Sequence, residues 1–526
     1  MRLRAPGLDT PGLALLAVAV AWLSTAAAIG LVEPTETRYA EIAREMRAGG
    51  DYLIPHLNGL PHFHKPPVAY WATALGFAAL GENEWGARVP AALASIVTLA
   101  LAIPIARRRF GRLGIPSGLV VWTLGTALLF FLLGRSVATD PYLAAAVAGF
   151  WALAPSAWAL GALGLGFLVK GPVVLVPTVL TVLIAASLGR DRESLRLLGP
   201  ARGWWLFAAV ALPWYLIVAI RTPGLLGYWL TEQLWQRYAT HVHQRPGPPW
   251  YFVGVLVAGS LPWTAAVIAG LARLWRERGE REARLLLCWL LVPLVFFSFS
   301  GSKLPAYLLP CFPAAALIAA RGWSRPGAAV RWTTAALLAG VAVAGWTLGP
   351  GALGHVVGGR GAEPIALPPS AHLALACIAY SATWMVRARP ARGALLVLFG
   401  LTALSVALAP YEGPLGSPRP LARVLAENRA RGEPIVEFAR FNAGVPFYLR
   451  ETVRLLEVPR ETAFEDPARH PAAFVTRDSL ASLGAMHPRV WILGPQGASA
   501  ALALSLGLQY QRVAGGKHET LGFVTR

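Results

Sequence analysis

The sequence has little charge, and its few charged residues are unbalanced in sign. Only 14% of the 526 residues are charged, against 56% that are hydrophobic. A single soluble core could not bury so much apolar surface, so the composition predicts a polytopic membrane protein. The net charge of +20 does not indicate a nucleic-acid partner, because no basic stripe with interleaved aromatic residues occurs outside the short connections between apolar runs.

Cysteine is almost absent, and no internal repeat is detectable. The three cysteines, Cys288, Cys311 and Cys377, lie in apolar segments without paired or metal-type spacing. This pattern indicates neither a disulfide framework nor a zinc–thiolate site. A lipid-phosphate transporter would be expected to show an inverted repeat or charges along a path to both faces, and neither feature is found.

Long apolar runs dominate the rest of the sequence. A window of about 20 residues predicts about thirteen transmembrane helices. The first run follows a basic start, but it is long enough to span, and we interpret it as an uncleaved helix. The predicted spans are 12–30, 88–106, 115–134, 141–153, 156–169, 172–188, 203–221, 249–272, 284–299, 304–321, 331–348, 370–386 and 393–409.

Arginine clusters fall in alternate connections, which predicts the orientation. With this number of spans, all clusters lie on one side, as the positive-inside rule requires, and they favour contact with anionic membrane lipids there. The N-terminus is then cytoplasmic. The long connections 31–87 and 222–248 lie on the opposite, periplasmic face, and so does the tail. The 68–80 segment is too short to span and is predicted to be an interfacial helix.

The chain divides into two predicted domains. Residues 1–410 form the transmembrane module, and residues 411–526 form a small extramembrane α/β domain. In the tail, "EPIVEFA" and "PRVWILGP" are typical of buried strands, whereas "RPLARVLAENRARG" and "SAALALSLG" are typical of helices. The Gly- and Pro-rich 349–369 segment is predicted to be a loop.

Charged and hydroxyl-bearing residues gather at the predicted periplasmic ends of the spans. Charges at such positions are costly and usually mark a substrate path or a site. The alternative for the 31–46 segment is a solvated helix held by surface ion pairs such as Glu41 with Arg44. The residues concerned are Glu36, Arg38, Tyr39, His64, Lys65, Arg135, Asp140, Lys170, Gln233, Arg237, Lys303 and Tyr307.

The charges in this set are mainly positive, which suits a phosphate or pyrophosphate carried by a lipid. Ammonium and guanidinium groups form charge-assisted hydrogen bonds that strengthen in a water-poor site. A carboxylate among them, Glu36 or Asp140, is a candidate general base for an acceptor hydroxyl. Lys170 has an alternative role as a structural charge that snorkels to the interface.

Five segments, in order and spacing, resemble the ArnT-like, protein-mannosyltransferase-related glycosyltransferases of the GT-C type. They cover most of residues 12–321. The resemblance implies an enzyme of the bacterial inner membrane that moves a sugar from a polyprenyl-phosphate donor to an acceptor on the periplasmic side, with inversion. Some relatives of this kind add aminoarabinose to lipid A. The segments are "EPTETRYAEIAREM", "NGLPHFHKPPVAYW", "FLVKGP", "EQLWQRY" and "FFSFSGSKLPAYLLP".

The sequence departs from the family pattern where catalysis is expected. The family aspartate favoured as the base is replaced by Thr35, whose hydroxyl cannot act as a base near neutral pH, so Glu36 is the nearest carboxylate. The family Phe-Glu-Lys-Pro is here Phe63-His64-Lys65-Pro66, and a Glu-His pair is Glu232-Gln233.

Three alternatives for a divalent metal stay open. His64 could bind it with Asp140 or Glu36, the pairs His62/His64 and His241/His243 could bind it elsewhere, or the cations alone could neutralise the leaving phosphate.

The sequence therefore predicts a glycosyltransferase that acts on a lipid or glycan acceptor. A catalytically inactive sugar-lipid binding protein and a protein O-mannosyltransferase are the alternatives. We predict Glu36 and Asp140 to be catalytic. The predicted donor-phosphate ligands are Arg38, Lys65, Arg237 and Lys303, and the other predicted substrate contacts are Tyr39, Tyr307, Lys170 and Gln233.

Overall fold

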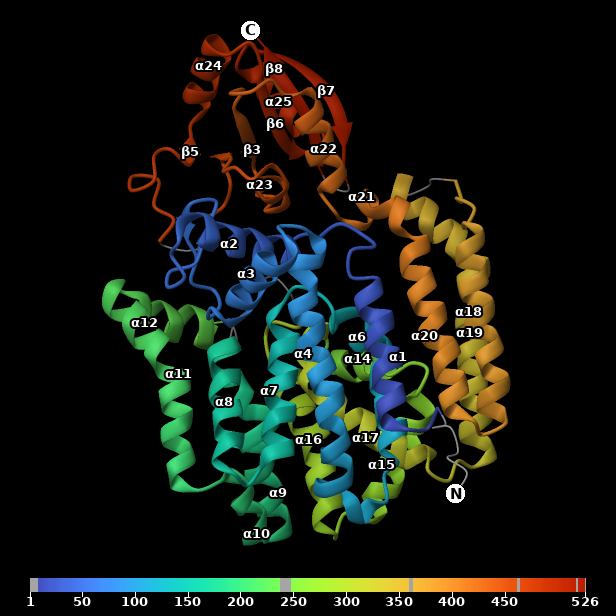
Figure 1. Cartoon of the computed structure of the whole chain (residues 1–526). Helices are drawn as coiled ribbons and strands as arrows, with labels where there is room; N and C mark the ends of the chain where they lie inside the picture. The colour runs from blue at the N-terminus through green and yellow to red at the C-terminus, as the bar shows by residue number, and fades with distance from the viewer. Residues whose placement is uncertain (1–7, 237–246, 359–362, 461–463, 517–518, 526) are drawn as a thin grey trace.

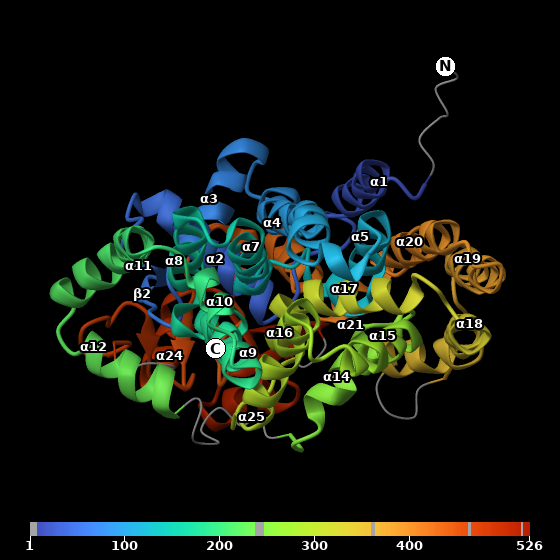
Figure 2. The same cartoon turned by 90° about the horizontal axis from the view of Figure 1, so that it is seen from below.

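The computed structural model describes residues 8–236, 247–358, 363–460, 464–516 and 519–525. Helices form a bundle, and a six-stranded sheet lies beyond one end of it (Figure 1). Seen from below, the bundle is elongated, with α11 at one end and α18 to α20 at the other (Figure 2). The bundle helices are α1 (Pro11–Ser24), α4 (Glu84–Pro104), α5 (Ser117–Thr126), α6 (Leu128–Leu133), α7 (Thr139–Leu153), α8 (Ala157–Lys170), α9 (Thr181–Gly189), α10 (Arg192–Leu195), α11 (Ala201–Arg221), α14 (Tyr251–Gly259), α15 (Thr264–Arg276), α16 (Arg281–Ser298), α17 (Phe312–Trp323), α18 (Ala328–Gly358), α19 (Pro369–Val386) and α20 (Pro390–Ala407).

The bundle confirms a multi-pass membrane protein, but not the predicted number of spans. Within the described ranges, six helical segments are long and apolar enough to cross a membrane, or seven if one bent pair counts as a span. Several other predicted spans are short apolar helices, among them α1 and α5. The number of about thirteen spans therefore stays a prediction.

One predicted span is bent at a proline, and one predicted loop is helical in its first part. The predicted 249–272 span is broken into α14 and α15, which meet at 114°. Pro262 lies in this break, where its missing N–H cannot continue a helical hydrogen-bond ladder. The predicted 349–369 loop is wrong in its first part, because α18 continues through Pro350 to Gly358. The helix is long and apolar enough to cross a membrane, and proline is tolerated inside such helices.

A layer of short elements lies between the bundle and the sheet (Figure 1). It contains α2 (Thr35–Gly49), the hairpin β1 (His56–Leu57) and β2 (Leu60–Pro61), α3 (Val68–Leu80) and α12 (Leu225–Tyr228). The hairpin turns at Asn58 and Gly59, both with positive φ, as a two-residue type I′ turn requires. The predicted Glu41–Arg44 pair forms at 2.7 Å on α2, but it is buried rather than on the surface.

The C-terminal part forms the predicted small α/β unit. Its sheet has the order β5-β4-β3-β6-β8-β7, in which the first four strands are parallel and β8 and β7 are antiparallel. In β6, Val490 and Ile492 pack into one core, and Trp491 and Leu493 pack into the core on the other face. The elements are α21 (Glu412–Leu415), α22 (Arg419–Asn428), β3 (Ile435–Phe438), α23 (Gly444–Leu449), β4 (Arg454–Leu456), β5 (Phe474–Val475), α24 (Arg477–Met486), β6 (Val490–Pro495), α25 (Ala498–Ser505), β7 (Gln509–Gly515) and β8 (Glu519–Thr525).

The α/β unit is joined by buried polar contacts to the segment between α1 and α4. The Tyr448 hydroxyl accepts a hydrogen bond from the Leu31 N–H at 2.8 Å and donates one to Glu84 at 2.9 Å. Glu33 accepts a hydrogen bond from the Gly444 N–H at 2.7 Å. These contacts tie α23 to the exit of α1 and to the start of α4.

Glu36 and Arg88 form the central ion pair of this layer. The Arg88 Nε and Nη2 atoms donate to the two Glu36 carboxylate oxygens at 2.9 and 2.5 Å. The carboxylate also accepts the N–H groups of Val32 and Val137 at 3.0 and 3.1 Å. The Arg88 guanidinium donates further to three backbone carbonyls that follow α1, those of Ala26, Ile29 and Gly30.

We expect Arg88→Met to destabilise the protein by about 3–5 kcal/mol, because it leaves the Glu36 carboxylate buried without its counter-charge. Thermal and denaturant unfolding in detergent measure the loss. The matched control is Arg112→Met, which removes an arginine whose side chain is 89% exposed; we expect a change within about 0.5 kcal/mol. Equal stability of Arg88→Met and wild type would contradict the structural role of the pair.

The buried carboxyl group of Glu33 should make the stability of the folded protein depend on pH. Burial raises the pKa of Glu33 from 4.5 to about 7, and the nearby Glu519 carboxylate adds to this rise. The folded state therefore binds the proton more tightly than the unfolded chain, so stability falls as pH rises from about 4.5 to 7.

Glu33→Gln keeps an oxygen acceptor for Gly444 and stays neutral at every pH. We expect it to gain roughly 1–3 kcal/mol over wild type at pH 8.5 and little at pH 5, as measured by thermal unfolding. Glu427→Gln changes an exposed carboxyl on α22 and serves as the control. A pH-independent difference between Glu33→Gln and wild type would show that Glu33 is already ionised near pH 5.

Candidate functional site

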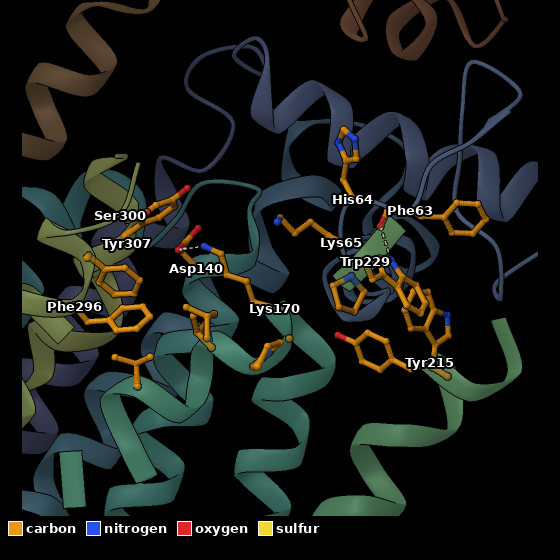
Figure 3. Close-up of a pocket in the computed structure, with 18 residues that line it drawn as sticks. Phe63, His64, Lys65, Asp140, Lys170, Tyr215, Trp229, Phe296, Ser300 and Tyr307 are labelled. Atoms are coloured by element: carbon orange, nitrogen blue, oxygen red, sulfur yellow. Dashed lines mark hydrogen bonds and ion pairs between the residues drawn. The ribbon is translucent and has the colours of Figure 1, made fainter. Parts of the chain in front are cut away.

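A cavity of about 290 Å³ opens where the bundle meets the layer of short elements (Figure 3). Its walls come from α7, α8 and α11 and from the segments that carry Lys65 and Tyr307. Residues distant in the sequence thus meet at one place, and five of the residues predicted at span ends are among them: His64, Lys65, Asp140, Lys170 and Tyr307. The lining residues are Phe63, His64, Lys65, Pro66, Asp140, Leu143, Lys170, Gly171, Pro172, Val173, Val176, Trp214, Tyr215, Trp229, Phe296, Phe297, Ser300 and Tyr307.

An Asp–Lys pair lies inside the cavity. Asp140 is in the first turn of α7, and Lys170 is the last residue of α8. Because the two helices form an antiparallel hairpin, these residues meet although they are 30 positions apart. The Lys170 Nζ atom donates to Asp140 Oδ1 at 2.5 Å, and the side chains are only 12% and 9% exposed.

Two further polar side chains approach this pair. The Lys170 ammonium lies 5.2 Å from the centre of the Tyr307 ring, within cation–π distance. Lys65 extends into the cavity from the segment after the hairpin, toward Asp140 and Lys170 (Figure 3). Two ammonium groups and one carboxylate therefore share the cavity. Their side chains give it a net positive charge, which favours an anionic ligand.

Aromatic side chains form most of the remaining wall. Trp214 and Tyr215 lie on α11, and Trp229 begins the π-helical segment Trp229–Gln236. Phe296 and Phe297 close the side formed by α16. Such a wall excludes water and lowers the local dielectric, so that a charged ligand interacts more strongly with the lysines. The sequence analysis missed these residues, although "ALPWYLI" at the end of a span carries the signal.

Glu36 lies outside this cavity. Its two oxygens accept hydrogen bonds from Arg88 and from backbone N–H groups, as described above. Burial acts to raise the pKa of Glu36, but the Arg88 guanidinium outweighs burial, and the pKa lies below 4.5. A carboxylate with this pKa and these partners is a weak base. Its geometry therefore favours a structural role, and the predicted role as general base finds no support in its position.

The other predicted residues are divided between the cavity and its surroundings. Lys303 donates to the carbonyl of Ser300, a lining residue, at 2.7 Å, which places Lys303 at the rim. Tyr39 packs on Tyr70 with ring centres 5.1 Å apart. In the described part of the chain, neither Tyr39 nor Arg38 is a lining residue.

Arg135 is bonded away from the cavity, and several other predicted side chains lie outside the described residues. The Arg135 guanidinium donates to Thr25 and Ser405, at 2.6 and 2.9 Å, away from the lining residues. Arg237 and the side chain of Gln233 lie outside the described residues, and so do His241 and His243. The roles predicted for these residues stay predictions.

His64 lines the cavity but does not belong to a cluster of potential metal ligands. Its ring stacks on Tyr228 at 6.4 Å and lies 4.3 Å from the ring of His62, centre to centre. Burial lowers the pKa of His62 well below 6.5, and the positive charges of His64, Arg38 and Lys65 add to the effect. Among the residues that the structure describes, no three His, Cys, Asp or Glu side chains form a group that could hold a metal.

Comparison with known proteins finds related sequences. Residues 64–220 match the family described as dolichyl-phosphate-mannose-protein mannosyltransferase. The chain is 37% identical over 331 residues to an undecaprenyl phosphate-alpha-4-amino-4-deoxy-L-arabinose arabinosyl transferase of Sodalis glossinidius, covering 59% of each protein. It is 34% identical over 308 residues to an arabinosyl transferase of the same description from Erwinia tasmaniensis, covering 56% of this chain and 55% of that one. The matches thus span little more than half the length of these relatives.

Comparison with solved structures extends the likeness to nearly the whole chain. Apo ArnT from Cupriavidus metallidurans superposes with a TM-score of 0.79 at 24% identity, covering 97% of this chain and 98% of that one. ArnT from the same organism bound to undecaprenyl phosphate gives a TM-score of 0.78, with 97% of each chain covered. The predicted resemblance is therefore confirmed: the chain is similar to arabinosyl transferases in sequence over little more than half its length, and to ArnT in fold over nearly its full length.

Proposed function

We propose that this protein is an inverting glycosyltransferase that moves a sugar from a polyprenyl-phosphate donor to a lipid or glycan acceptor. It acts at the periplasmic face of the bacterial inner membrane, with its N-terminus in the cytoplasm and its C-terminal α/β domain, residues 411–526, in the periplasm. The alternating arginine clusters support this orientation. The names of the relatives suggest an aminoarabinose linked to undecaprenyl phosphate as the donor, and lipid A is the first acceptor to test.

The observation that carries the proposal is the pair of lysines in an aromatic cavity. Lys65 and Lys170 place two ammonium groups in a space that is otherwise walled mainly by apolar side chains. A phosphate at this place would form charge-assisted hydrogen bonds with both lysines, and the polyprenyl chain could extend along apolar surface into the membrane. Lys303 at the rim adds positive charge on the same side.

The arrangement suggests a role for each of these residues in the reaction. The acceptor hydroxyl attacks the anomeric carbon, the bond from that carbon to the phosphate oxygen breaks, and the lipid phosphate leaves. Lys65 and Lys170 stabilise the negative charge that develops on the phosphate. Asp140 accepts the acceptor proton through its second oxygen, Oδ2, while Oδ1 stays bonded to Lys170. No step needs a metal, and a role for His64 as a metal ligand stays a separate proposal.

Sugar transfer tests the assignment directly. Purified protein in nanodiscs is given radiolabelled undecaprenyl-phosphate sugars and a lipid extract that contains lipid A. We expect Lys65→Ala to lower turnover by about 10²–10³-fold. We expect Asp140→Asn to lower it by about 10²–10⁴-fold. Arg112→Ala, which removes one positive charge at an exposed site, should stay within about twofold. Unchanged melting temperatures would show that the variants stay folded.

The outcomes separate the alternatives. Thr35, in place of the family aspartate, favours an inactive binding protein. That alternative would be established if wild type binds the donor without transferring the sugar and Thr35→Asp gains transfer. The family matched by residues 64–220 favours a protein O-mannosyltransferase, and label found in protein rather than lipid would support it. If Asp140→Asn keeps full transfer activity and Glu36→Gln loses it, Glu36 rather than Asp140 is the general base.

A further inference from the structure

The C-terminal α/β domain reaches the wall of the cavity through one aromatic side chain. Phe464 lies in the connection between β4 and β5. Its ring meets the ring of Phe63 edge to face, with centres 5.1 Å apart, and the ring of Tyr228 at 5.6 Å in the same manner. Phe464 therefore joins an apolar cluster whose other members belong to the membrane module and its first periplasmic segment.

Phe63 is held from two sides. Its carbonyl oxygen accepts a hydrogen bond from the Trp229 indole N–H at 3.1 Å, so the backbone is fixed by the cavity wall. Its side chain is 1% exposed and rests on Phe464. Phe63 immediately precedes His64 and Lys65. The hydrogen bond from Trp229 and the ring contact with Phe464 together hold the residue from which the backbone continues to Lys65.

A second contact joins the same segment to the α/β domain. The Asn58 amide donates to the Val453 carbonyl at 2.8 Å, and the Asn58 side-chain oxygen accepts the Val453 N–H at 2.8 Å. The Glu45 carboxylate accepts the N–H groups of Asn58 and Gly59 at 2.6 and 2.9 Å. The start of the segment is thus fixed by polar contacts, whereas Phe464 fixes the part next to Lys65.

We infer that Phe464 is a positioning residue for the anionic group of the donor. The α/β domain, through the Phe464–Phe63 contact, holds Lys65 at the distance at which its ammonium reaches a phosphate bound beside Lys170. The inference rests on the proposed function, because it takes a polyprenyl phosphate as the ligand. A long, flexible lysine side chain loses conformational entropy when it binds a phosphate, so it contributes little binding free energy unless its backbone is already fixed. Small displacements of groups that position a substrate can also lower the reaction rate strongly.

Binding of undecaprenyl phosphate to the full-length protein in nanodiscs tests the inference. Phe464→Ala removes both ring contacts, and we expect it to raise Kd by about tenfold while the melting temperature changes little. Phe464→Tyr keeps the ring and should restore Kd to within about twofold of wild type. Phe464→Leu keeps most of the apolar volume without the ring geometry, so its Kd should lie between the two.

Phe523→Ala is the matched control. Phe523 is a partly buried phenylalanine of the same domain; it packs on Trp491 at 5.3 Å, and it contributes to a core that contains no lining residue of the cavity. We expect this variant to lower the melting temperature without changing Kd. If Phe464→Ala fails to fold, the comparison of Phe464→Leu with Phe464→Tyr decides the question, since a positioning role requires weaker binding in the leucine variant.

Lys65→Ala separates failure of this inference from failure of the proposed function. If Lys65→Ala weakens binding and Phe464→Ala binds like wild type, Phe464 does not position the site, although the phosphate site stands. If wild type does not bind undecaprenyl phosphate, or if Lys65→Ala binds equally well, the proposed function itself is wrong. Equal weakening in Phe464→Ala and Phe523→Ala would reduce the effect to general instability of the domain and would overturn the inference.

Discussion

The buried pair of Glu36 and Arg88 is the interaction on which the arrangement of the layer between the bundle and the sheet depends. Arg88 is a buried residue near the start of α4, and it binds both the Glu36 carboxylate of α2 and three carbonyls at the exit of α1. Glu36 in turn accepts the N–H of Val137, three residues before Asp140. One ion pair thus sets the positions of two helices, one connection and the start of α7. Because charges buried in this way are costly when unpaired, the pair allows few alternative packings.

The cost of burying an unpaired charge also applies to the acidic residue in the cavity, but there the pairing leaves room for a ligand. Asp140 and Lys170 are also buried and paired, but the cavity gives their remaining hydrogen-bonding capacity access to a ligand. The carboxylate of Glu36, in contrast, is saturated by the protein itself. The two acidic residues therefore differ in what they can do, although both are carboxylates at the edge of the membrane. Available hydrogen-bonding capacity, rather than charge alone, separates a reactive carboxylate from a structural one.

Local patterns predicted much of the fold and part of the site. The strands around Val436 and Ile492 and helices such as α3 follow from apolar periodicity and were predicted within a few residues. Asp140, Lys170 and Tyr307 were found because charge and hydroxyl groups at span ends are unusual, and a helical hairpin brings such ends together. The pairing of Glu36 with Arg88 could not be predicted, since 52 residues separate the two and only the tertiary packing joins them.

The contact between Asn58 and Val453 can form only late in the synthesis of the chain. The two residues are 395 positions apart, and Phe464 comes later still. At synthesis rates of roughly 5–20 residues per second, the hairpin waits about 20–80 s after its own synthesis for its C-terminal partner. During this interval the Lys65 segment lacks its contacts with Val453 and Phe464, although its contacts with Glu45 and Trp229 can already form. The order of synthesis therefore places the support from the α/β unit last, and a chain truncated before residue 453 would lack that support.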